Sequence, residues 1–175
     1  MSDAADRASA LLERMPLSLR ARLAELRRSI HQEPELAFAE TRTAEKLEAC
    51  LRELGVSDVK RVTKTGIVAR VKGTRSGAPT VALRGDMDAL PITEDTGLPF
   101  ASKHAGVMHA CGHDVHATWA VGAAALLAPT PAEGDVVILL QPAEEVGRGA
   151  RAMTEAGALD GVSMIFGAHV DRRFE

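Results

Sequence analysis

The stretch GDVVILLQ, residues 134–141, is a continuous apolar run that ends in a glutamine. A strand with one solvated face alternates apolar and polar residues, whereas a strand covered on both faces is apolar throughout. This run therefore predicts an inner strand of a sheet that is covered on both sides.

Helical and strand patterns alternate along the chain on either side of this run. Helices are expected at 19–30, 40–54, 120–128 and 148–156, and further strands at 80–86 and 163–169. Two β-branched runs around Lys64-Thr65-Gly66 predict a hairpin. Strands that alternate with helices, together with apolar inner strands, predict a three-layer α/β domain.

The composition is that of one globular domain, with 175 residues, a net charge of −3 and 46% hydrophobic residues. The aromatic content of 3% and the lack of basic runs argue against a nucleic-acid partner. No run approaches the roughly 18 apolar residues that span a membrane. The opening MSDAADRASALLERM lacks the apolar core of a signal peptide. We therefore expect a cytoplasmic protein with no membrane partner, in which Cys50 is a thiol within a helical core pattern.

Three apolar strands run directly into polar clusters at their carboxyl ends. The clusters are RGDMD at 84–88, QPAEE at 141–145 and GAHVD at 167–171. Open α/β sheets bind ligands outside the carboxyl ends of their strands. The side chains expected to meet at this edge are Asp86, Asp88, Glu144, Glu145 and His169.

The segment HACGHDVHAT, residues 109–118, holds three of the six histidines and one of the two cysteines. Cys111 and His113 are two residues apart, so in an extended segment their side chains point the same way. Thiolate, imidazole and carboxylate donors together favour zinc or a neighbouring first-row metal. Alone, Cys-Gly-His is more typical of a loop, but Glu145 and His169 at strand ends favour a metal site.

The pair Glu144-Glu145 has two interpretations. Adjacent carboxylates repel each other unless a cation or a proton lies nearby. One carboxylate would bind metal and the other would serve as general base for a metal-activated water; the alternative is a solvated turn. Asp88 is expected to accept a hydrogen bond from a ligating histidine, and its alternative role is a cap or an Asx turn.

The remaining histidines are assigned less specifically. His109 and His116 either contact a substrate, support a ligand or belong to a polar loop, and their roles stay open. His31 is interpreted as a helix-end histidine outside any cluster, and His104 has no assigned role.

Five blocks of the sequence closely resemble a metal-dependent amidohydrolase family. It comprises hippurate hydrolases, N-acyl-amino-acid amidohydrolases and indole-acetyl-amino-acid hydrolases, within the aminoacylase and carboxypeptidase clan. The blocks, in the family's order from about residue 17 onward, are RRSIHQEPELAFAET, LRGDMDALPITEDTGLPFAS, HACGHDVHAT, LLQPAEEVGRGA and IFGAHV. The resemblance implies a three-layer α/β/α catalytic domain with a mixed, largely parallel sheet. It also implies hydrolysis of the amide bond between an acyl group and an amino acid.

The resemblance also implies roles for individual residues. The implied metal ligands are Cys111, His113, Glu145 and His169. Glu144 corresponds to the catalytic base and Asp88 to the aspartate that orients a ligand. Two divalent ions are implied, with manganese, zinc, cobalt and nickel all suitable for the mixed donors. Cys111 corresponds to a bridging carboxylate of the clan, so the resemblance implies a bridging thiolate. The implied substrate is a small N-acyl amino acid or a peptide-like molecule.

Family members are much longer and continue into a lid and dimerisation domain before a final histidine ligand. We therefore expect residues 1–175 to be the N-terminal part of a dinuclear catalytic domain, without the lid and the C-terminal part. A homo-oligomer is considered only for a full-length form.

Two rival functions stay open. Cys111 with His113 or His116 would form a nucleophile–base pair of a thiol hydrolase, which chelators would leave active. Alternatively, the chain is an inactive or partner-dependent fragment that binds metal.

Overall fold

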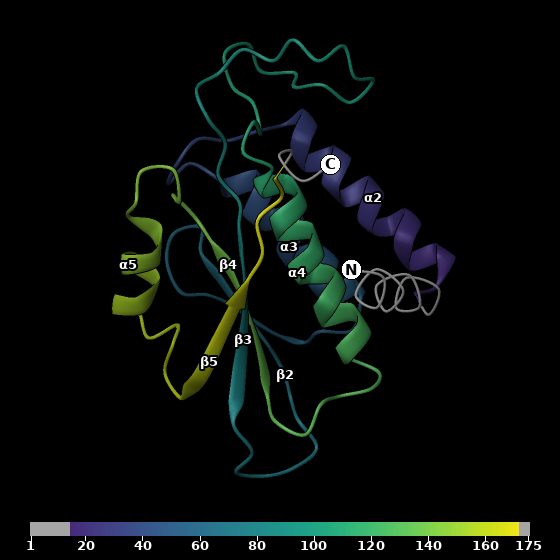
Figure 1. Ribbon diagram of the computed structural model, residues 1–175, viewed down its shortest axis with the longest axis vertical. Helices are drawn as coiled ribbons and strands as arrows, with labels where there is room; N and C mark the ends of the chain where they lie inside the picture. Colours follow the sequence, from purple (N-terminus) through teal and green to yellow (C-terminus); the bar gives the residue numbers. More distant parts are fainter. Residues whose placement is uncertain (1–14, 172–175) are drawn as a thin grey trace.

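The computed structural model describes residues 15–171 of the chain (Figure 1). Its helices are α2 (Leu17–Gln32), α3 (Thr41–Glu53), α4 (His113–Leu127) and α5 (Gly149–Glu155). Its strands are β1 (Asp58–Arg61), β2 (Ile67–Val71), β3 (Thr80–Asp86), β4 (Val136–Gln141) and β5 (Val162–Gly167). The expectation about a signal peptide concerns the segment before Met15, which lies outside the described residues and stays a prediction.

Strand β4 lies in the middle of a five-stranded sheet with the order β1-β2-β4-β3-β5. All six of its residues are buried, as the apolar run predicts for a strand covered on both faces. Its side chains alternate between two cores, with Val136, Ile138 and Leu140 on one face and Val137 and Leu139 on the other. The alternation is the two-residue period of a strand, and it requires a covering layer on each side.

Helices supply both covering layers. In Figure 1 the sheet is seen nearly edge-on, with α5 on one side and α2, α3 and α4 on the other. The larger core joins the sheet to Ile30 of α2, Leu47 of α3 and Val121 of α4, whereas Met153 of α5 packs in the smaller core. Cys50 is fully buried in the larger core, which confirms its prediction as a core residue. The three-layer α/β/α architecture is therefore confirmed.

The sheet is mixed, as expected, but its parallel share is smaller than expected. Strand β3 pairs in parallel with both β4 and β5. The hairpin β1–β2 belongs to the same sheet, and β2 pairs antiparallel with β1 and with β4. Half of the pairings are thus antiparallel, because the hairpin joins the sheet through β2, which pairs with β4.

The parallel strands β4, β3 and β5 bring the three predicted polar clusters to one edge. Asp86 at the end of β3 pairs with Gln141 at the end of β4. Arg84 of β3 pairs with Gly167, the last residue of β5. Helix α4 begins at this edge with His113, at the upper end of the sheet in Figure 1. Residues that lie far apart in the sequence therefore meet here.

Helix α4 crosses β3 at close range, and this contact can be tested. A Cβ atom at Gly85 would lie 2.4 Å from the backbone oxygen of His116. We expect Gly85→Ala to push the helix from the sheet and to lower the free energy of unfolding by about 1–3 kcal/mol. The control is Gly122→Ala in the same helix, whose Cβ would meet the movable end of Leu23 at 2.9 Å. In Gly122→Ala the contact with Leu23 is offset by the higher helix propensity of alanine, so this variant should lose less stability than Gly85→Ala. Urea unfolding that gave equal stabilities for the two variants would contradict this account.

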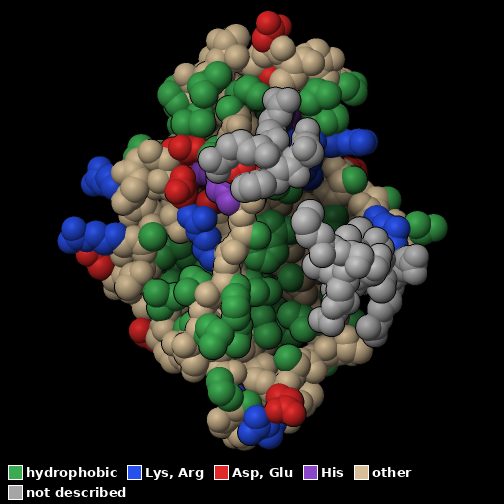
Figure 2. Space-filling model, viewed as in Figure 1, with side chains coloured by type: hydrophobic (Ala, Val, Ile, Leu, Met, Phe, Trp, Pro, Cys, Tyr) green, Lys and Arg blue, Asp and Glu red, His purple; other side chains and the backbone are tan. Residues whose placement is uncertain are grey.

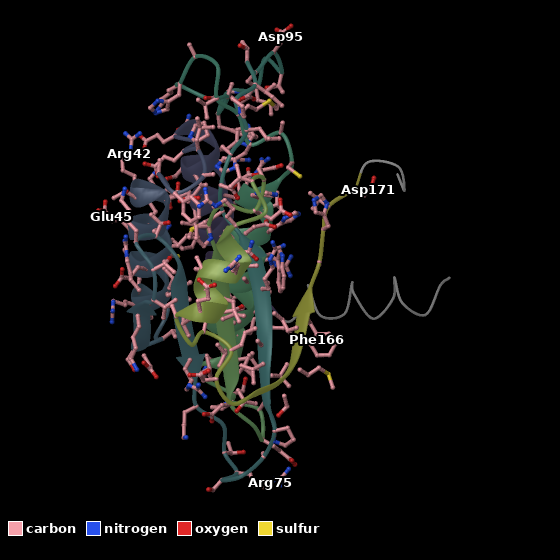
Figure 3. The ribbon with its side chains drawn as sticks, turned by 90° about the vertical axis from the view of Figure 1, so that its left-hand side faces the viewer. Arg42, Glu45, Arg75, Asp95, Phe166 and Asp171 are labelled. Carbon is pink, nitrogen blue, oxygen red and sulfur yellow. The ribbon has the colours of Figure 1, made fainter. Side chains whose placement is uncertain are left out.

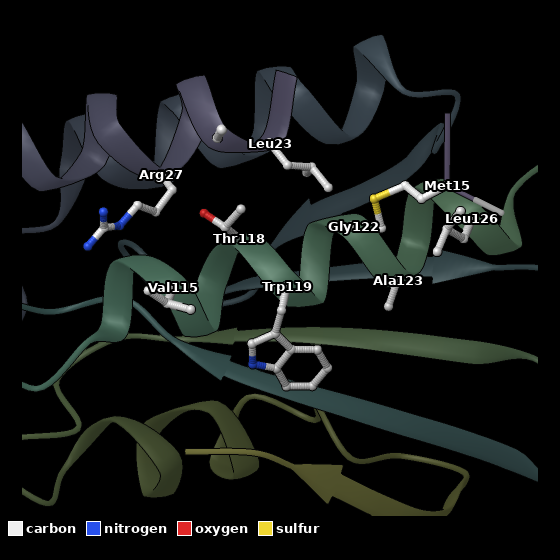
Figure 4. A pocket seen from close by; sticks show the side chains of 10 residues that line it. Met15, Leu23, Arg27, Val115, Thr118, Trp119, Gly122, Ala123 and Leu126 are labelled. Carbon is white, nitrogen blue, oxygen red and sulfur yellow. The ribbon is translucent and has the colours of Figure 1, made fainter. Parts of the chain in front are cut away.

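An apolar groove of about 580 Å³ runs between α2 and α4 (Figure 4). Leu23 lies on one side of it, and Trp119 and Leu126 lie on the other. Arg27 is the one charged residue among its described lining residues, and none of the predicted site residues lines it. Within residues 15–171, no helix combines the length and the apolar character that crossing a membrane requires.

Candidate metal centre

His113 is buried at the first position of α4, and Asp88 holds its imidazole ring. The ring Nδ1–H donates to the backbone oxygen of Asp88 at 2.9 Å and to its carboxylate Oδ1 at 3.2 Å. A neutral imidazole with a proton on Nδ1 carries its free lone pair on Nε2. The Nε2 atom of His113 is buried and has no hydrogen-bond partner among the described residues. This is the tautomer that a metal-binding histidine needs.

Asp88 also orients the two adjacent glutamates. Its carboxylate accepts the backbone N–H of Glu144 at 3.0 Å and that of Glu145 at 3.1 Å. As a result, Glu144 Oε2 lies 3.7 Å and Glu145 Oε1 lies 3.6 Å from His113 Nε2. These separations are too long for hydrogen bonds. The separation between His113 Nε2 and Glu145 Oε1 suits two atoms that bind one ion, since each metal–ligand bond is roughly 2.0–2.3 Å long.

Cys111 and His169 close the other side of the same cluster. Cys111 Sγ lies 3.3 Å from His169 Nε2, and the Nδ1–H of His169 donates to the backbone oxygen of Val170 at 2.7 Å. The donor atoms of Cys111, His113 and His169 all lie within 4.8 Å of one another. Those of His113, Glu144 and Glu145 form a second group within the same limit, and those of Asp86, His113 and His116 form a third, so all three groups share His113.

The electrostatic environment of the cluster is strongly negative. Burial and the neighbouring carboxylate of Glu145 raise the pKa of the Cys111 thiol to about 11. Burial alone would lower the pKa of His113, but the hydrogen bond that His113 donates to Asp88 and the negative charge of Asp86 outweigh burial and raise that pKa. Without a cation, the thiol therefore stays protonated at neutral pH. In Figure 2 histidine and acidic side chains meet at this part of the surface.

The donor atoms fit a divalent cation. Buried polar atoms in proteins nearly always have a partner, yet His113 Nε2 and Glu145 Oε1 are both buried and lack a hydrogen bond within the described residues. A positive ion between them would satisfy both atoms and offset the negative charge. Sulfur, imidazole and carboxylate donors together suit a first-row transition metal.

Asp86 lies at the same edge, but its oxygens are already engaged. The Nδ1–H of His116 donates to Asp86 Oδ1 at 2.7 Å, and Arg84 Nη1 lies 2.5 Å from Asp86 Oδ2. Asp86 Oδ1 is 3.7 Å from His113 Nε2. Asp86 therefore adds negative charge beside His113, while its direct contacts go to other residues.

The expectation that His31 stands outside any cluster is wrong. His31 does lie in the last turn of helix α2, but its Nδ1 contacts Asp114 at 2.9 Å and its Nε2 contacts Glu94 at 3.2 Å. Arg27 Nε lies 2.6 Å from the same Asp114 carboxylate. The hydrogen bond to Asp114 is the main reason that the pKa of His31 is raised. This buried charge cluster ties α2 to the start of α4, directly after His113.

His109 is buried beside this charge cluster. Neither of its ring nitrogens has a hydrogen-bond partner among the described residues, and burial lowers its pKa to about 4. Its ring centre lies 6.2 Å from that of His31. His109 is therefore neutral at physiological pH.

Glu40 is a further buried residue at this edge, and no motif or spacing predicts a role for it. Its carboxylate accepts the backbone N–H groups of Phe38 and Ala143 and the hydroxyl of Thr65. Ala143 has a φ of 50°, in the left-handed region that residues other than glycine rarely adopt. Glu40 thus holds the strained turn that leads from β4 into Glu144.

The Asp88 carboxylate accepts hydrogen bonds from His113, Glu144 and Glu145, so its effect on metal binding can be tested by substitution. We expect Asp88→Asn to weaken metal binding by about 10- to 100-fold, because an amide accepts at one atom only and carries no charge. The measurement is a competition titration with Zn²⁺, and Asp95→Asn at the exposed loop tip is the matched control (Figure 3). Unchanged affinity in Asp88→Asn would show that this carboxylate does not organise the cluster.

Comparisons with known proteins agree with this geometry. N-acetylcysteine deacetylase of Bacillus subtilis is 50% identical over 152 residues, which cover 85% of this chain and 40% of that protein. An IAA-amino acid hydrolase of Arabidopsis thaliana is 48% identical over 150 residues, which cover 85% of this chain and 32% of that protein. The chain thus spans at most about two fifths of the length of these relatives.

A solved structure has the same fold. It is a Bacillus subtilis protein described as a dinuclear metal binding peptidase from the M20 family, with 46% sequence identity and a TM-score of 0.85. The match covers 89% of this chain and 44% of that one. Residues 82–174, more than half of the chain, match the profile of peptidase family M20/M25/M40. The chain belongs to peptidase family M20/M25/M40.

Proposed function

We propose that this chain carries the metal-binding and catalytic edge of a metal-dependent amidohydrolase that cleaves the amide bond of N-acyl amino acids. The single observation that carries the proposal is the convergence of donor atoms at the carboxyl ends of β3, β4 and β5. His113 Nε2 lies near the carboxylate of Glu145, and the donor atoms of His113, Cys111 and His169 lie within 4.8 Å of one another.

The proposed ligands for two divalent cations are Cys111, His113, Glu145 and His169. Manganese, zinc, cobalt and nickel all suit these donors. When bound, such cations supply positive charge that polarises an amide carbonyl and acidifies a water molecule. Asp88 orients the ligand His113 and keeps the proton of that imidazole on Nδ1.

Glu144 is proposed as the general base rather than as a ligand. Its side chain is 39% exposed, against 20% for Glu145, so Glu144 has more room to face a substrate. Glu145 contacts the Cys111 thiol, which draws its carboxylate into the donor cluster. Glu144 takes a proton from the attacking water and passes it to the leaving amine nitrogen, which becomes the free amino acid.

The proposed substrates are small N-acyl amino acids or peptide-like molecules. The relatives named above are a deacetylase of N-acetylcysteine and a hydrolase of IAA-amino acids, and both names describe an acyl group on an amino acid. Because the chain matches only 40% of the first relative's length, we propose that it forms part of a larger catalytic unit. We also propose a cytosolic location, where the free cysteines stay reduced, and self-association of that larger unit.

The experiment is a hydrolysis assay of the 175-residue chain on a panel of N-acetyl amino acids. The chain is first freed of metal and then loaded with Mn²⁺, Zn²⁺, Co²⁺ or Ni²⁺ in turn. We expect turnover that depends on the added metal and that a chelator abolishes.

Two other outcomes would overturn the catalytic assignment. Turnover that survives the chelator would favour a Cys111 nucleophile, although the raised pKa of this thiol argues against that chemistry. Bound metal without turnover would show that this chain contributes a metal-binding fragment only.

A further inference from the structure

His116 is fully buried in α4 and connects three parts of the fold. Its Nδ1–H donates to Asp86 Oδ1 at 2.7 Å, and its Nε2 accepts the backbone N–H of Val170 at 3.0 Å. Asp86 ends β3, whereas Val170 lies three residues beyond the end of β5. The His116 ring therefore links the end of β3 to the segment that follows β5, the strand that pairs with β3.

The segment that carries His169 lies directly against the start of α4. A Cβ atom on Gly112 would lie 2.4 Å from Cγ2 of Val170. The rings of His116 and His169 meet edge to face, with their centres 4.6 Å apart. The hydrogen bond to His116, the close approach to Gly112 and the ring contact with His116 thus all restrain His169 or Val170.

We propose that His116 is a positioning residue that holds the exit of β5, so that His169 Nε2 faces Cys111 Sγ. The inference rests on the proposed role of His169 as a metal ligand. It assigns to His116 no contact with substrate or metal, because both of its ring nitrogens are already engaged.

The structural reason is the exposure of the His169 segment. β5 is an edge strand whose side chains Met164, Ile165 and Phe166 are about half exposed, and Figure 3 labels Phe166 on this strand. His169 follows this strand and is itself exposed. An exposed side chain on an edge loses conformational freedom when it binds an ion. The hydrogen bond that the next backbone N–H, that of Val170, donates to buried His116 limits that loss.

The first measurement needs no variant and no metal. Nitrogen-15 shifts of the histidine rings in the cation-free chain report which nitrogen of His116 carries the proton. We expect the Nδ1–H form, since Nε2 must accept from Val170. A proton on Nε2 would overturn the proposal directly.

Two substitutions then distinguish the hydrogen bond at Nδ1 of His116 from the one at Nε2. His116→Asn keeps a donor near the Nδ1 position and loses the acceptor that faces Val170, whereas His116→Gln keeps an acceptor near the Nε2 position. In the cation-free chain, backbone relaxation should show residues 168–171 more mobile in His116→Asn and unchanged in His116→Gln. Equal mobility in the two variants would contradict the proposal.

A double-mutant cycle with Co²⁺ completes the test. We expect His116→Asn to weaken Co²⁺ binding by about 10- to 100-fold, and we expect His169→Ala to weaken it as well. In the His169→Ala background, His116→Asn should cause no further loss, because its effect acts through His169. Losses that multiply in the double variant would show a general structural role and overturn the proposal.

The same cycle separates this inference from the proposed function. If His169→Ala binds Co²⁺ as tightly as the unchanged chain, the proposed ligand set is wrong and the positioning role falls with it. If His169→Ala binds weakly but His116→Asn does not, the ligand set stands and only the role of His116 is refuted.

Discussion

Glu144→Gln is expected to lower kcat for N-acyl amino acid hydrolysis by about 10²- to 10⁴-fold, the usual contribution of a general base. Glutamine has the same shape but accepts no proton at neutral pH. The backbone N–H of residue 144 would still donate to Asp88, so the turn and the nearby ligands should stay in place. Metal content measured by mass spectrometry should therefore equal that of the unchanged protein.

Glu145→Gln is the matched comparison, because it makes the same chemical change one residue away. If Glu145 is the ligand, this variant should lose metal affinity, with its activity recovering as more metal is added. Glu133→Gln at an exposed position should alter neither property. Full activity in Glu144→Gln, or metal loss equal to that of Glu145→Gln, would refute the assignment of the base.

Asp114→Ala should lower the free energy of unfolding by about 3–5 kcal/mol, a large share of the stability of an ordinary domain. Asp114 is fully buried and contacts both His31 and Arg27. Removing its carboxylate leaves the buried His31 ring and the Arg27 guanidinium without this acceptor. The measurement is urea unfolding with chelator present, so that metal binding does not contribute to the observed stability.

Asp95→Ala serves as the control for that experiment, because Asp95 is exposed at the tip of the long loop (Figure 3). Its unfolding free energy should stay within about 0.5 kcal/mol of the unchanged protein. A loss below 1 kcal/mol in Asp114→Ala would mean that the cluster around His31 is solvated and not essential to the fold.

Local pattern was sufficient to predict most of the fold. The unbroken apolar run of β4 indicated a strand covered on both faces, and all six of its residues are buried. Which strands become neighbours is not a local property, however. The hairpin β1–β2 could have joined any free edge, and nothing within its sequence indicated antiparallel pairing with β4.

The candidate site was predictable to a similar degree and for the same reason. Polar residues after apolar strands predicted that Asp88, Glu145 and His169 would lie at one edge, and the structure brings them together. The contact of His31 with Asp114 joins residues 83 positions apart and has no sequence pattern of its own. The partner of His116 is a backbone N–H, which every residue except proline carries, so the sequence offers no signal for it.

The hold of Asp88 on His113 and on the backbone of Glu144 and Glu145 has a thermodynamic consequence. Much of the conformational freedom of these three residues is lost when the chain folds, before any ion arrives. Cation capture should then release water with little rearrangement of the protein. Such a preorganised pocket favours ions by their preferred coordination geometry, because the ligands cannot relax to suit every size of ion.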